Sequence, residues 1–416
     1  MLRQHCPAGS RTLPGRDAIW QSLFLAAPEL SQAGHIATAL HPGFSTLVRG
    51  SHAGASMYDQ LTSWDNLLLA YRRASKGKRS QPVVAAFEYH LEDHLLALQD
   101  ALRTYTYRPG AYTHFFIHEP KRRLISAAPF RDRVVHHALC NLIEPIFERT
   151  FVTDSYANRR GKGTHRALQR VQNLSRQYPY VLQCDLRQFF PSVDHTILRG
   201  ILARKITDSD VLWLIDRILE SGRGVLSEVY NMVYFPGDDL FAALRPRGLP
   251  IGNLTSQFWA NVYLNPFDHF VKRTLRCPGY VRYVDDMLFF ATDPATLWTW
   301  KTVIQERLAA VRLTIHPGAH PRPITEGIPF LGFVVFPQRR RLKRRKGIYF
   351  RRHLAHLMAA WHADAMPLTR VTASVQGWVN HVRYGNTVGL RTAVLWHADR
   401  GPRSVPSSHG RASLYG

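Results

Sequence analysis

Residues 280–290, which read YVRYVDDMLFF, set two adjacent aspartates inside a strongly apolar stretch of the chain. A stretch of this kind favours two short β-strands joined by a tight turn, and that turn would carry Asp285 and Asp286. Two neighbouring carboxylates in apolar surroundings destabilise a fold unless a cation neutralises them. The segment therefore predicts a hairpin that presents acids to a divalent cation, and the alternative is an ordinary polar turn.

A third acid, Asp185, lies at the end of a second apolar stretch, residues 180–186. Mg²⁺ in proteins binds a few carboxylate oxygens together with substrate phosphates. If the two stretches are neighbouring strands, Asp185, Asp285 and Asp286 would hold two Mg²⁺ ions, with Mn²⁺ as the alternative metal. Two ions about 3.5–4 Å apart activate a 3′-hydroxyl and stabilise a leaving pyrophosphate. Adjacent side chains of a hairpin point to opposite faces, so Asp286 is not required to bind a metal directly.

The charge of the chain indicates a polyanionic partner. Its 416 residues include 54 Lys and Arg against 30 Asp and Glu, a formal net charge of +24. Such an excess is most simply explained by nucleic acid, and a merely soluble basic protein is the alternative. Residues 339–346 are the densest basic run, and we expect them to contact nucleic-acid phosphates rather than form a solvated surface. The cations of this run are Arg339, Arg340, Arg341, Lys343, Arg344, Arg345 and Lys346.

Composition excludes several classes of protein. Apolar residues make up 45% of the chain, which is enough for a buried core and excludes a mainly disordered protein. No run of about 20 apolar residues is present, so no membrane span is expected, and no signal-peptide pattern opens the chain. The four cysteines lack CxxC spacing, which excludes a zinc ribbon and favours reduced thiols in the cytoplasm.

Hydrophobic periodicity divides the chain into segments. Residues 1–56 lack a sustained pattern and are predicted to be a weakly ordered N-terminal extension, unless the true start is Met57. Beyond them, apolar residues recur at helical or strand spacing over most of the chain. Helices are expected over 58–75, 83–104, 132–151, 194–205, 257–274, 294–311 and 351–397, and strands over 112–118, 180–186, 280–290 and 330–336.

Several motifs occur in the chain order found in reverse transcriptases of the bacterial, group II intron-like lineage, and the chain resembles that family. These motifs are YVDD at 283–286, Asp185 with Phe189 and Phe190, GLPIGNLTSQ at 248–257, FLGF at 330–333, and the upstream segments 121–133 and 154–165. Within the lineage, the combination of Ile251 with Gln257 most resembles the reverse transcriptases of diversity-generating retroelements.

The resemblance implies an α+β fold of the right-hand polymerase type and RNA-directed DNA polymerase activity. Such an enzyme would extend a DNA or RNA primer on an RNA template with dNTPs and Mg²⁺. In a retroelement it would make mutagenised cDNA, and it would bind a small accessory protein. The expected parts are fingers over 57–177, a palm with an antiparallel sheet over 178–336, a basic linker and small helical thumb over 337–400, and a flexible tail over 401–416.

The resemblance also implies roles for single residues around the acids. The backbone carbonyl of Leu186 would add a metal ligand. Lys121 and Arg123 would grip the triphosphate, because guanidinium donors match phosphate oxygens. Phe190 would exclude a ribose 2′-hydroxyl and so favour deoxynucleotides. The adjacent Phe189 leaves open which of the two rings is a core residue.

Further roles concern the nascent base pair and its surroundings. Ile251, Gly252 and Gln257 would lie at that pair, where Gly252 allows close approach of the backbone. Ile251, in place of a polar side chain, would loosen the hold on the template base and favour errors at template adenines. Lys162 would approach the template or the triphosphate. Unless no proton donor is needed, His316 or His320 would take the place of a lysine that many relatives carry.

Three alternatives stay open at this level. A reverse transcriptase of a defence system or of a group II-derived element would share the same metal chemistry. A non-catalytic RNA-binding protein on a polymerase scaffold would have no reason to retain three costly acids. An RNA-templated RNA polymerase would be disfavoured by the bulk of Phe190.

Overall fold

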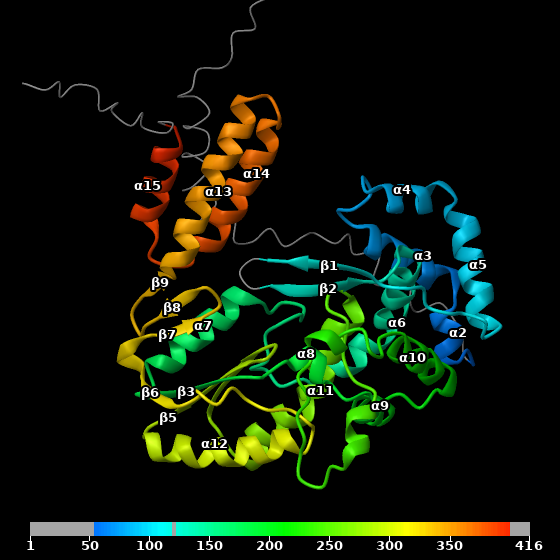
Figure 1. The fold of residues 1–416 in the computed structure, drawn as a ribbon, viewed down its shortest axis with the longest axis horizontal. Coiled ribbons are helices and arrows are strands. Elements are labelled where there is room, and N and C mark those ends of the chain that lie inside the picture. Colours follow the sequence, from blue (N-terminus) through cyan, green and yellow to red (C-terminus); the bar gives the residue numbers. More distant parts are fainter. Residues whose placement is uncertain (1–53, 119–121, 400–416) are drawn as a thin grey trace, which may run out of the picture. The chain divides into compact units, whose positions relative to one another are not determined.

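The computed structural model describes residues 54–118 and 122–399 of the chain (Figure 1). The compact unit considered below begins at Ser56. Apart from residues 54–56, the predicted N-terminal extension lies outside the described residues. Lys121 and the predicted tail over 401–416 also lie outside them.

Helices dominate the first part of the unit. The first helix begins where the Ser56 side chain accepts a hydrogen bond from the Asp59 backbone N–H, and the Asp59 carboxylate accepts one from the Ser56 backbone N–H. The predicted helix over 83–104 is two helices in the structure, which meet at His90. The helices are α2 (Met57–Leu61), α3 (Trp64–Ser75), α4 (Pro82–Tyr89), α5 (Leu91–Arg103) and α6 (Phe130–Glu148).

A two-stranded antiparallel hairpin separates α5 from α6 in the chain. It consists of β1 (Thr113–Ile117) and β2 (Arg123–Ala127), with Phe115 opposite Ile125. Every residue of β1 is exposed, whereas in β2 buried positions alternate with exposed or half-buried ones. The buried face of β2 therefore provides a surface on which later parts of the chain pack.

The central sheet has four antiparallel strands in the order β4-β5-β3-β6. These are β3 (Tyr180–Asp185), β4 (Gly279–Tyr283), β5 (Asp286–Ala291) and β6 (Pro321–Pro323). Both faces are buried, which explains why β3 to β5 read as nearly continuous apolar runs. The hairpin predicted over 280–290 is confirmed as β4, a turn and β5.

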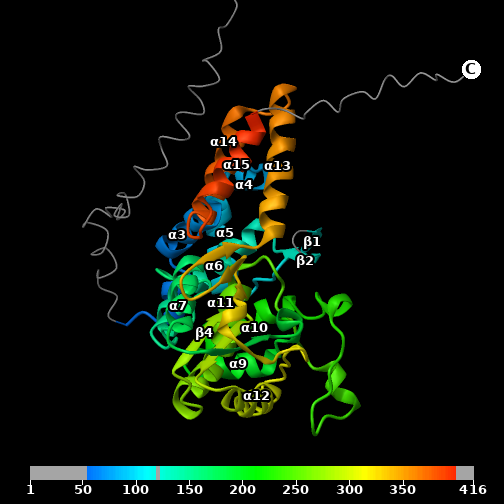
Figure 2. The same cartoon turned by 90° about the vertical axis from the view of Figure 1, so that its left-hand side faces the viewer.

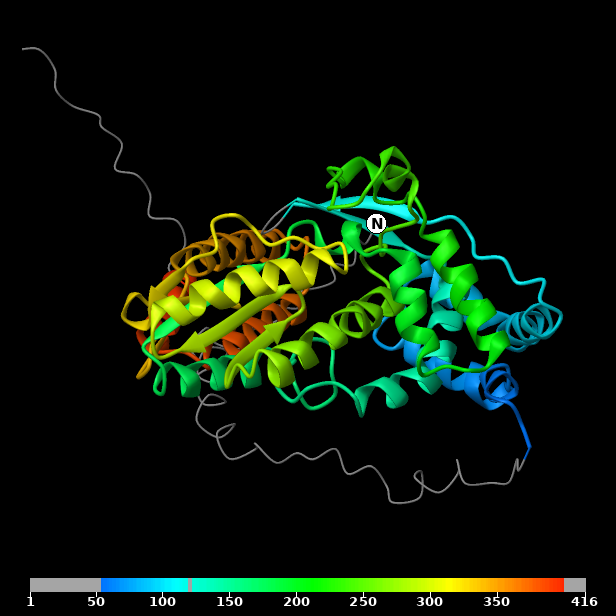
Figure 3. The same cartoon turned by 90° about the horizontal axis from the view of Figure 1, so that it is seen from below.

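Helices cover one face of this sheet, and a helix together with a small sheet covers the other. Figure 3 shows α12 (Pro294–Ala309) running along the strands. The first face packs with α9 (His195–Ala203), α11 (Leu254–His269) and α12 through Leu182, Cys184, Met287 and Phe289. The opposite face packs with α7 (Thr164–Ser175), β7 (Ile328–Phe330) and β8 (Phe333–Val335) through Val181, Val281, Leu288 and Phe290.

The remaining central elements lie between β3 and β6 in the chain or just before β3. They are α7 (Thr164–Ser175), α8 (Phe189–Ser192), α9 (His195–Ala203), α10 (Ser209–Ser221), α11 (Leu254–His269) and α12 (Pro294–Ala309). A single π-helical segment, η3 (Phe270–Thr274), continues α11. Two short 3₁₀ helices, η1 (Ser227–Val229) and η2 (Leu240–Leu244), lie in the segment 222–247 between α10 and α11, and η4 (Ile324–Glu326) follows β6.

The C-terminal part consists of a three-stranded antiparallel sheet and three helices. The strands are β7 (Ile328–Phe330), β8 (Phe333–Val335) and β9 (Arg340–Leu342), and the helices are α13 (Arg344–His362), α14 (Leu368–Val382) and α15 (Val388–Asp399). Figure 2 shows the three helices side by side. The region 351–397 is helical as predicted, and breaks at Pro367 and Gly385 divide it into separate helices.

Three antiparallel sheets combined with many helices place the chain in the α+β class, as predicted. Among residues 54–118 and 122–399, no helix has the length and apolar character that a membrane crossing requires.

Candidate active site

The three predicted acids meet at one end of the central sheet. Strands β3 and β5 pair so that Asp185 lies directly opposite Asp286, and Asp285 occupies the turn before β5. Residues directly opposite each other on antiparallel strands project from the same face. The backbone N–H of Leu186 also donates to the Asp285 carbonyl at 3.3 Å. The register thus brings acids from distant parts of the sequence onto one face, and Asp286 is on the face of Asp185.

The charges of the acids influence each other. Burial raises the pKa of Asp286, and the neighbouring Asp185 and Asp285 carboxylates raise it further, to about 7. Hydrogen bonds from Gln183 and the positive charge of Lys343 act in the opposite direction. A cation at this place would remove the repulsion, so the carboxylate oxygens fit a hard divalent ion. Within residues 54–118 and 122–399, however, no three His, Cys, Asp or Glu side chains already converge as a metal-binding group.

A buried ion pair holds the turn between β4 and β5. Arg282 is fully buried and makes two hydrogen bonds to Asp268, of 2.8 Å from Nε and 2.6 Å from Nη2. Its Nη1 donates to Asn261 Oδ1 and to the backbone carbonyl of Val284, at 3.0 and 3.1 Å. Val284 has a φ of +58°, which is strained for a β-branched residue. Arg282 therefore supports the strained residue that precedes Asp285.

Sequence reasoning missed this arginine as a structural residue. The available signal was its position, since Arg282 is a lone cation within the apolar run 280–290. A charge in such a place requires a buried partner. Its partner Asp268 lies on α11, and a single sequence does not indicate that pairing.

The segment after α12 reaches Asp185. The backbone N–H of His316 donates to the Asp185 carbonyl at 2.9 Å, and His316 Nε2 lies 3.8 Å from Asp185 Oδ2. The backbone N–H of Arg187 donates to the Thr314 carbonyl at 2.8 Å. Both histidines are exposed, and His320 bonds through Nδ1 to the Gly318 carbonyl. Of the two histidines predicted as proton donors, the structure places His316 beside an acid.

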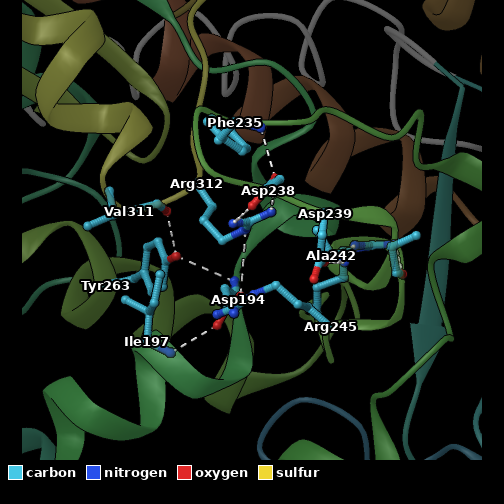
Figure 4. Close-up of polar contacts among 12 residues, drawn as sticks. Asp194, Ile197, Phe235, Asp238, Asp239, Ala242, Arg245, Tyr263, Val311 and Arg312 are labelled. Atoms are coloured by element: carbon cyan, nitrogen blue, oxygen red, sulfur yellow. Dashed lines mark hydrogen bonds and ion pairs between the residues drawn. The ribbon is translucent and has the colours of Figure 1, made fainter.

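A polar network fixes the segment 222–247 near this place (Figure 4). Arg312, which precedes the segment beside Asp185, makes two hydrogen bonds to Asp238, of 2.7 and 2.6 Å. Asp194 caps α9 through the Ile197 N–H and accepts a hydrogen bond from Arg245 Nε at 2.6 Å. Arg312 Nε also lies 3.9 Å from Asp194. The network joins the start of α9, the segment 222–247 and the chain that follows α12.

The predicted base-pair segment packs against β2. The Ser126 N–H donates to the Ile251 carbonyl at 2.8 Å, and Asn253 Nδ2 donates to the Ser126 carbonyl at 2.8 Å. Asn253 Oδ1 accepts from the Ala128 N–H at 3.1 Å. Asn253, which the sequence analysis did not single out as a functional residue, thus locks this segment to the hairpin β1–β2. Ile251 is half-buried there.

Gly252 is required by the same packing. Its φ is +114°, and a Cβ atom on it would lie 2.9 Å from Ile125 Cγ2 of β2. In this structure, the backbone of Gly252 therefore approaches β2 of the protein closely. Gln257 is exposed on the first turns of α11.

The two adjacent phenylalanines differ in environment. Phe189 is buried in the core, whereas Phe190 is half-buried at its edge. The Phe190 carbonyl accepts a hydrogen bond from the Leu249 N–H at 2.9 Å, so Phe190 lies beside the segment 248–257. Arg123 is exposed at the start of β2. Of the two rings, Phe190 is therefore the one that keeps some exposed surface.

Arg340 is a correction to the expectation for the basic run. It is buried in β9, and its donors are used by Gln172 Oε1 at 2.9 Å, Gln169 Oε1 at 2.6 Å and the Tyr384 carbonyl at 3.3 Å. Arg340 therefore joins α7 to the segment between α14 and α15, and three of its five N–H groups are used within the protein. Lys343 is half-buried, and its charge acts on Asp286. The other cations of the run are exposed, namely Arg339, Arg341, Arg344, Arg345 and Lys346.

Lys162 lies in the loop before α7. Its ammonium donates to the Thr153 carbonyl at 2.8 Å and lies 5.1 Å from the centre of the Tyr156 ring. The first residue of α7 reaches the hairpin β4–β5, since Thr164 Oγ1 is 3.1 Å from the Tyr283 hydroxyl.

Comparison with known proteins identifies the family. Residues 118–335, just over half of the chain, match the family model described as reverse transcriptase (RNA-dependent DNA polymerase). Protein YkfC of Escherichia coli (strain K12) is 27% identical over 52% of this chain and 52% of its own length. The group II intron-encoded protein LtrA of Lactococcus lactis subsp. cremoris is 25% identical over 43% of this chain and 28% of its own length.

More distant relatives agree with these two. Nuclear intron maturase 1 of Arabidopsis thaliana is 31% identical over 26% of this chain and 16% of its own length. The chain thus spans about half or less of the length of the curated relatives named here. A solved telomerase from Candida albicans overlaps with a TM-score of 0.40 at 9% identity, over 63% of this chain and 54% of that one, which is too distant to support an assignment. On the family model and these relatives, the chain belongs to the reverse transcriptase (RNA-dependent DNA polymerase) family.

Proposed function

We propose that the protein is an RNA-directed DNA polymerase that extends a primer on an RNA template with dNTPs. The observation that carries the proposal is the register of β3 with β5, which sets Asp185 directly opposite Asp286 beside the turn that holds Asp285. Membership of the reverse transcriptase family supports the same activity. In this proposal, residues 57–177 act as fingers, 178–336 as the palm, and 337–400 as the basic linker and thumb.

The acids would bind Mg²⁺, or Mn²⁺ in its place. Asp185, Asp285, Asp286 and the Leu186 carbonyl are the groups that would hold it. Two such ions lower the pKa of a primer 3′-hydroxyl and stabilise the charge on a leaving pyrophosphate. The protein's own part is to keep the acids together, through the β3–β5 register and through the support that Arg282 gives to the turn.

Nucleotide selection would fall to residues around the acids. Phe190, half-buried beside the segment 248–257, would close the space that a ribose 2′-hydroxyl needs. Exposed Arg123, with Lys121 near it in sequence, would bind the triphosphate. Gly252 and Gln257 would lie near the nascent base pair. His316, whose Nε2 lies 3.8 Å from Asp185 Oδ2, would donate a proton to the leaving group.

Template and primer would bind along exposed cations. Arg339, Arg341 and Arg344 are exposed between β8 and the start of α13, and such cations give affinity without reading sequence. Lys162 would add a contact from the loop before α7. Cys140, Cys184 and Cys277 are free, buried thiols, which suits the reducing cytoplasm in which we propose that the protein works.

The test of this function is primer extension by the full chain. With an RNA template, a DNA primer, dNTPs and Mg²⁺, we expect cDNA from the wild type and a loss of at least about 10³-fold for Asp285→Asn. Asp100→Asn, which changes an exposed acid of α5, is the matched control and should leave the rate unchanged. cDNA synthesis by Asp285→Asn at the wild-type rate would contradict the proposal. Phe190→Ala should admit ribonucleotides.

We further propose that the polymerase makes mutagenised cDNA in a diversity-generating retroelement, with a small accessory protein as partner. Ile251, which is half-buried and fixed through its carbonyl to Ser126, offers the template base no hydrogen bond from its side chain. Ile251→Gln should therefore lower the error frequency at template adenines. An unchanged error spectrum of sequenced products would contradict this role.

A second candidate is a role in a group II-derived element. The similarity to the intron-encoded protein LtrA and to nuclear intron maturase 1 favours it. Such a protein would bind a folded intron RNA in preference to an unstructured RNA of the same length. Equal affinity for the two RNAs, measured at the same salt concentration, would speak against this candidate.

A further inference from the structure

We propose that Gln183 is a positioning residue that fixes the carboxylate of Asp286 and ties it to the strand β7. The inference rests on the proposed function, because it assigns Gln183 a task in the same metal-binding centre. Gln183 lies on β3, two residues before Asp185, and therefore on the same face of the sheet as the acids. It is a half-buried polar residue between buried Leu182 and Cys184.

All the donors of the Gln183 amide are used. Its Nε2 lies 3.0 Å from Asp286 Oδ1 and 3.3 Å from Asp286 Oδ2, and it also donates to the Pro329 carbonyl of β7 at 3.2 Å. One amide nitrogen thus contacts both oxygens of the acid and the backbone of a strand from another sheet. Rotation of the Asp286 carboxylate would break these hydrogen bonds.

Arg322 fixes the orientation of the amide itself. Its Nη2 donates to Gln183 Oε1 at 2.9 Å. Arg322 lies on β6 directly opposite Val181, which makes it the diagonal neighbour of Gln183 on the same face. A flipped amide would place its oxygen against a carboxylate and a carbonyl, and its N–H groups against a guanidinium. The hydrogen-bonded series Arg322–Gln183–Asp286 is therefore stable in only one orientation of the Gln183 amide.

This arrangement gives Gln183 an effect on metal binding that a purely structural residue would not have. Partners that hydrogen-bond a metal ligand orient it, and their loss typically weakens metal affinity or activity about 10–100-fold. Pro329 belongs to β7, the first strand of the hairpin β7–β8. Gln183 therefore links that hairpin to Asp286 through hydrogen bonds from one amide group. The charge of Lys343, which follows β9 in the same small sheet, acts on the same acid.

The experiment compares Gln183→Leu with wild type in the full chain. Titration with Mn²⁺ alone, followed by calorimetry, should show about tenfold or weaker binding by the variant. In primer extension, kcat should fall and the Mg²⁺ concentration for half-maximal rate should rise, while the KM for dNTP stays within about twofold. Gln177→Leu, which changes an exposed glutamine after α7, is the matched control and should behave as wild type.

Arg322→Met is the second variant and keeps the test decisive if Gln183→Leu does not fold. It leaves Gln183 in place without its orienting partner, so we expect a smaller loss of Mn²⁺ affinity in the same direction. The double variant should bind Mn²⁺ no more weakly than Gln183→Leu alone, because Arg322 acts through Gln183. Wild-type Mn²⁺ affinity in a folded Gln183→Leu chain, or in Arg322→Met if the former is unfolded, overturns the inference.

The proposed function can fail separately. A wild-type chain that binds Mn²⁺ but makes no cDNA contradicts the polymerase proposal, and the Mn²⁺ affinities of the variants then still decide the role of Gln183. A wild-type chain that binds no Mn²⁺ overturns the inference.

Discussion

At the scale of single residues, a position constrains the fold most strongly where its backbone conformation and its neighbours allow only one type of residue. Gly252 has a φ that side chains rarely adopt, and Ile125 occupies the space of a Cβ. The glycine therefore determines how closely the segment 248–257 approaches β2.

We predict that Gly252→Ala lowers the free energy of unfolding by about 1–3 kcal/mol, because it combines backbone strain with a clash. Gly377→Ala is the control, since a Cβ at that position in α14 would meet no atom within 4 Å. This control should be stabilised by about 0.5–1 kcal/mol. Urea unfolding of both variants measures the difference, and an equal shift in both would refute the explanation.

His136 makes stability depend on pH. It is buried in α6, and burial together with His137 and Arg133 lowers its pKa to about 3. The unfolded chain, with a histidine pKa near 6.5, then binds more protons than the folded chain between these values. Stability is therefore present above about pH 6.5 and is lost as the pH falls toward 3.

We predict that His136→Gln flattens this dependence by up to about 1.4 kcal/mol per pH unit below pH 6.5. Urea unfolding at pH 7 and pH 5.5 would measure it. His356→Gln, at an exposed position of α13, should keep the wild-type dependence. His137, whose pKa is lowered to about 4 by burial, Lys78 and Arg73, retains its own contribution in both variants. The same slope in His136→Gln as in wild type would exclude His136 as the source.

Residue chemistry could be predicted from the sequence where the local pattern was sufficient. The convergence of Asp185, Asp285 and Asp286 was predicted because carboxylates are rare inside apolar strands, and the pairing of β3 with β5 brings them together. Arg340 was expected to contact phosphates, and Gln183 was not singled out from the sequence. Their roles depend on partners distant in the sequence, such as Gln172 and Pro329, which only the folded chain specifies.

At the scale of elements, the basic run 339–346 is divided between structure and surface. Arg340 belongs to β9 and joins it to α7 through its hydrogen bond to Gln172. Arg341 and Arg344, by contrast, are exposed. The basic run thus contains both a buried structural arginine and exposed arginines, and the sequence alone does not distinguish them.

We predict that Arg341→Gln with Arg344→Gln reduces the slope of log affinity against log salt for a template–primer duplex by about 2, one unit for each lost phosphate contact. Stability should be unchanged. Arg340→Gln should instead lower the free energy of unfolding by about 1–3 kcal/mol, because Gln169 and Gln172 lose their donor. A salt titration and urea unfolding separate the two effects, and an unchanged slope in the double variant would remove these arginines from the interface.

The segment 222–247 depends on Arg312. This residue joins it through Asp238 to the chain that lies beside Asp185. We predict that Arg312→Met increases the rate of chymotrypsin cleavage in this segment, at exposed residues such as Tyr234 and Phe241. Arg307→Met, at an exposed position of α12, is the control. Equal cleavage rates would show that the segment is held by other contacts.

At the scale of the molecule, the α+β class and the antiparallel central sheet follow from short apolar strands that are separated in the chain by amphipathic helices. Both faces of that sheet are covered, which is why its strands read as continuous apolar runs. The division of the C-terminal region into α13, α14 and α15 was not predicted, because its turns depend on Pro367 and Gly385 within an otherwise helical pattern.

The central claim is that acids from β3 and from the β4–β5 turn hold one metal centre. Fe²⁺ with ascorbate, which cleaves backbone near a bound ion, tests this most directly in the wild-type chain. We expect fragments that end near Asp185 and near Asp285, loss of both cleavages with excess Mg²⁺, and loss of both in Asp185→Asn. Cleavage at one site that persists in Asp185→Asn, or no cleavage at either site in a chain that makes cDNA, would contradict the account.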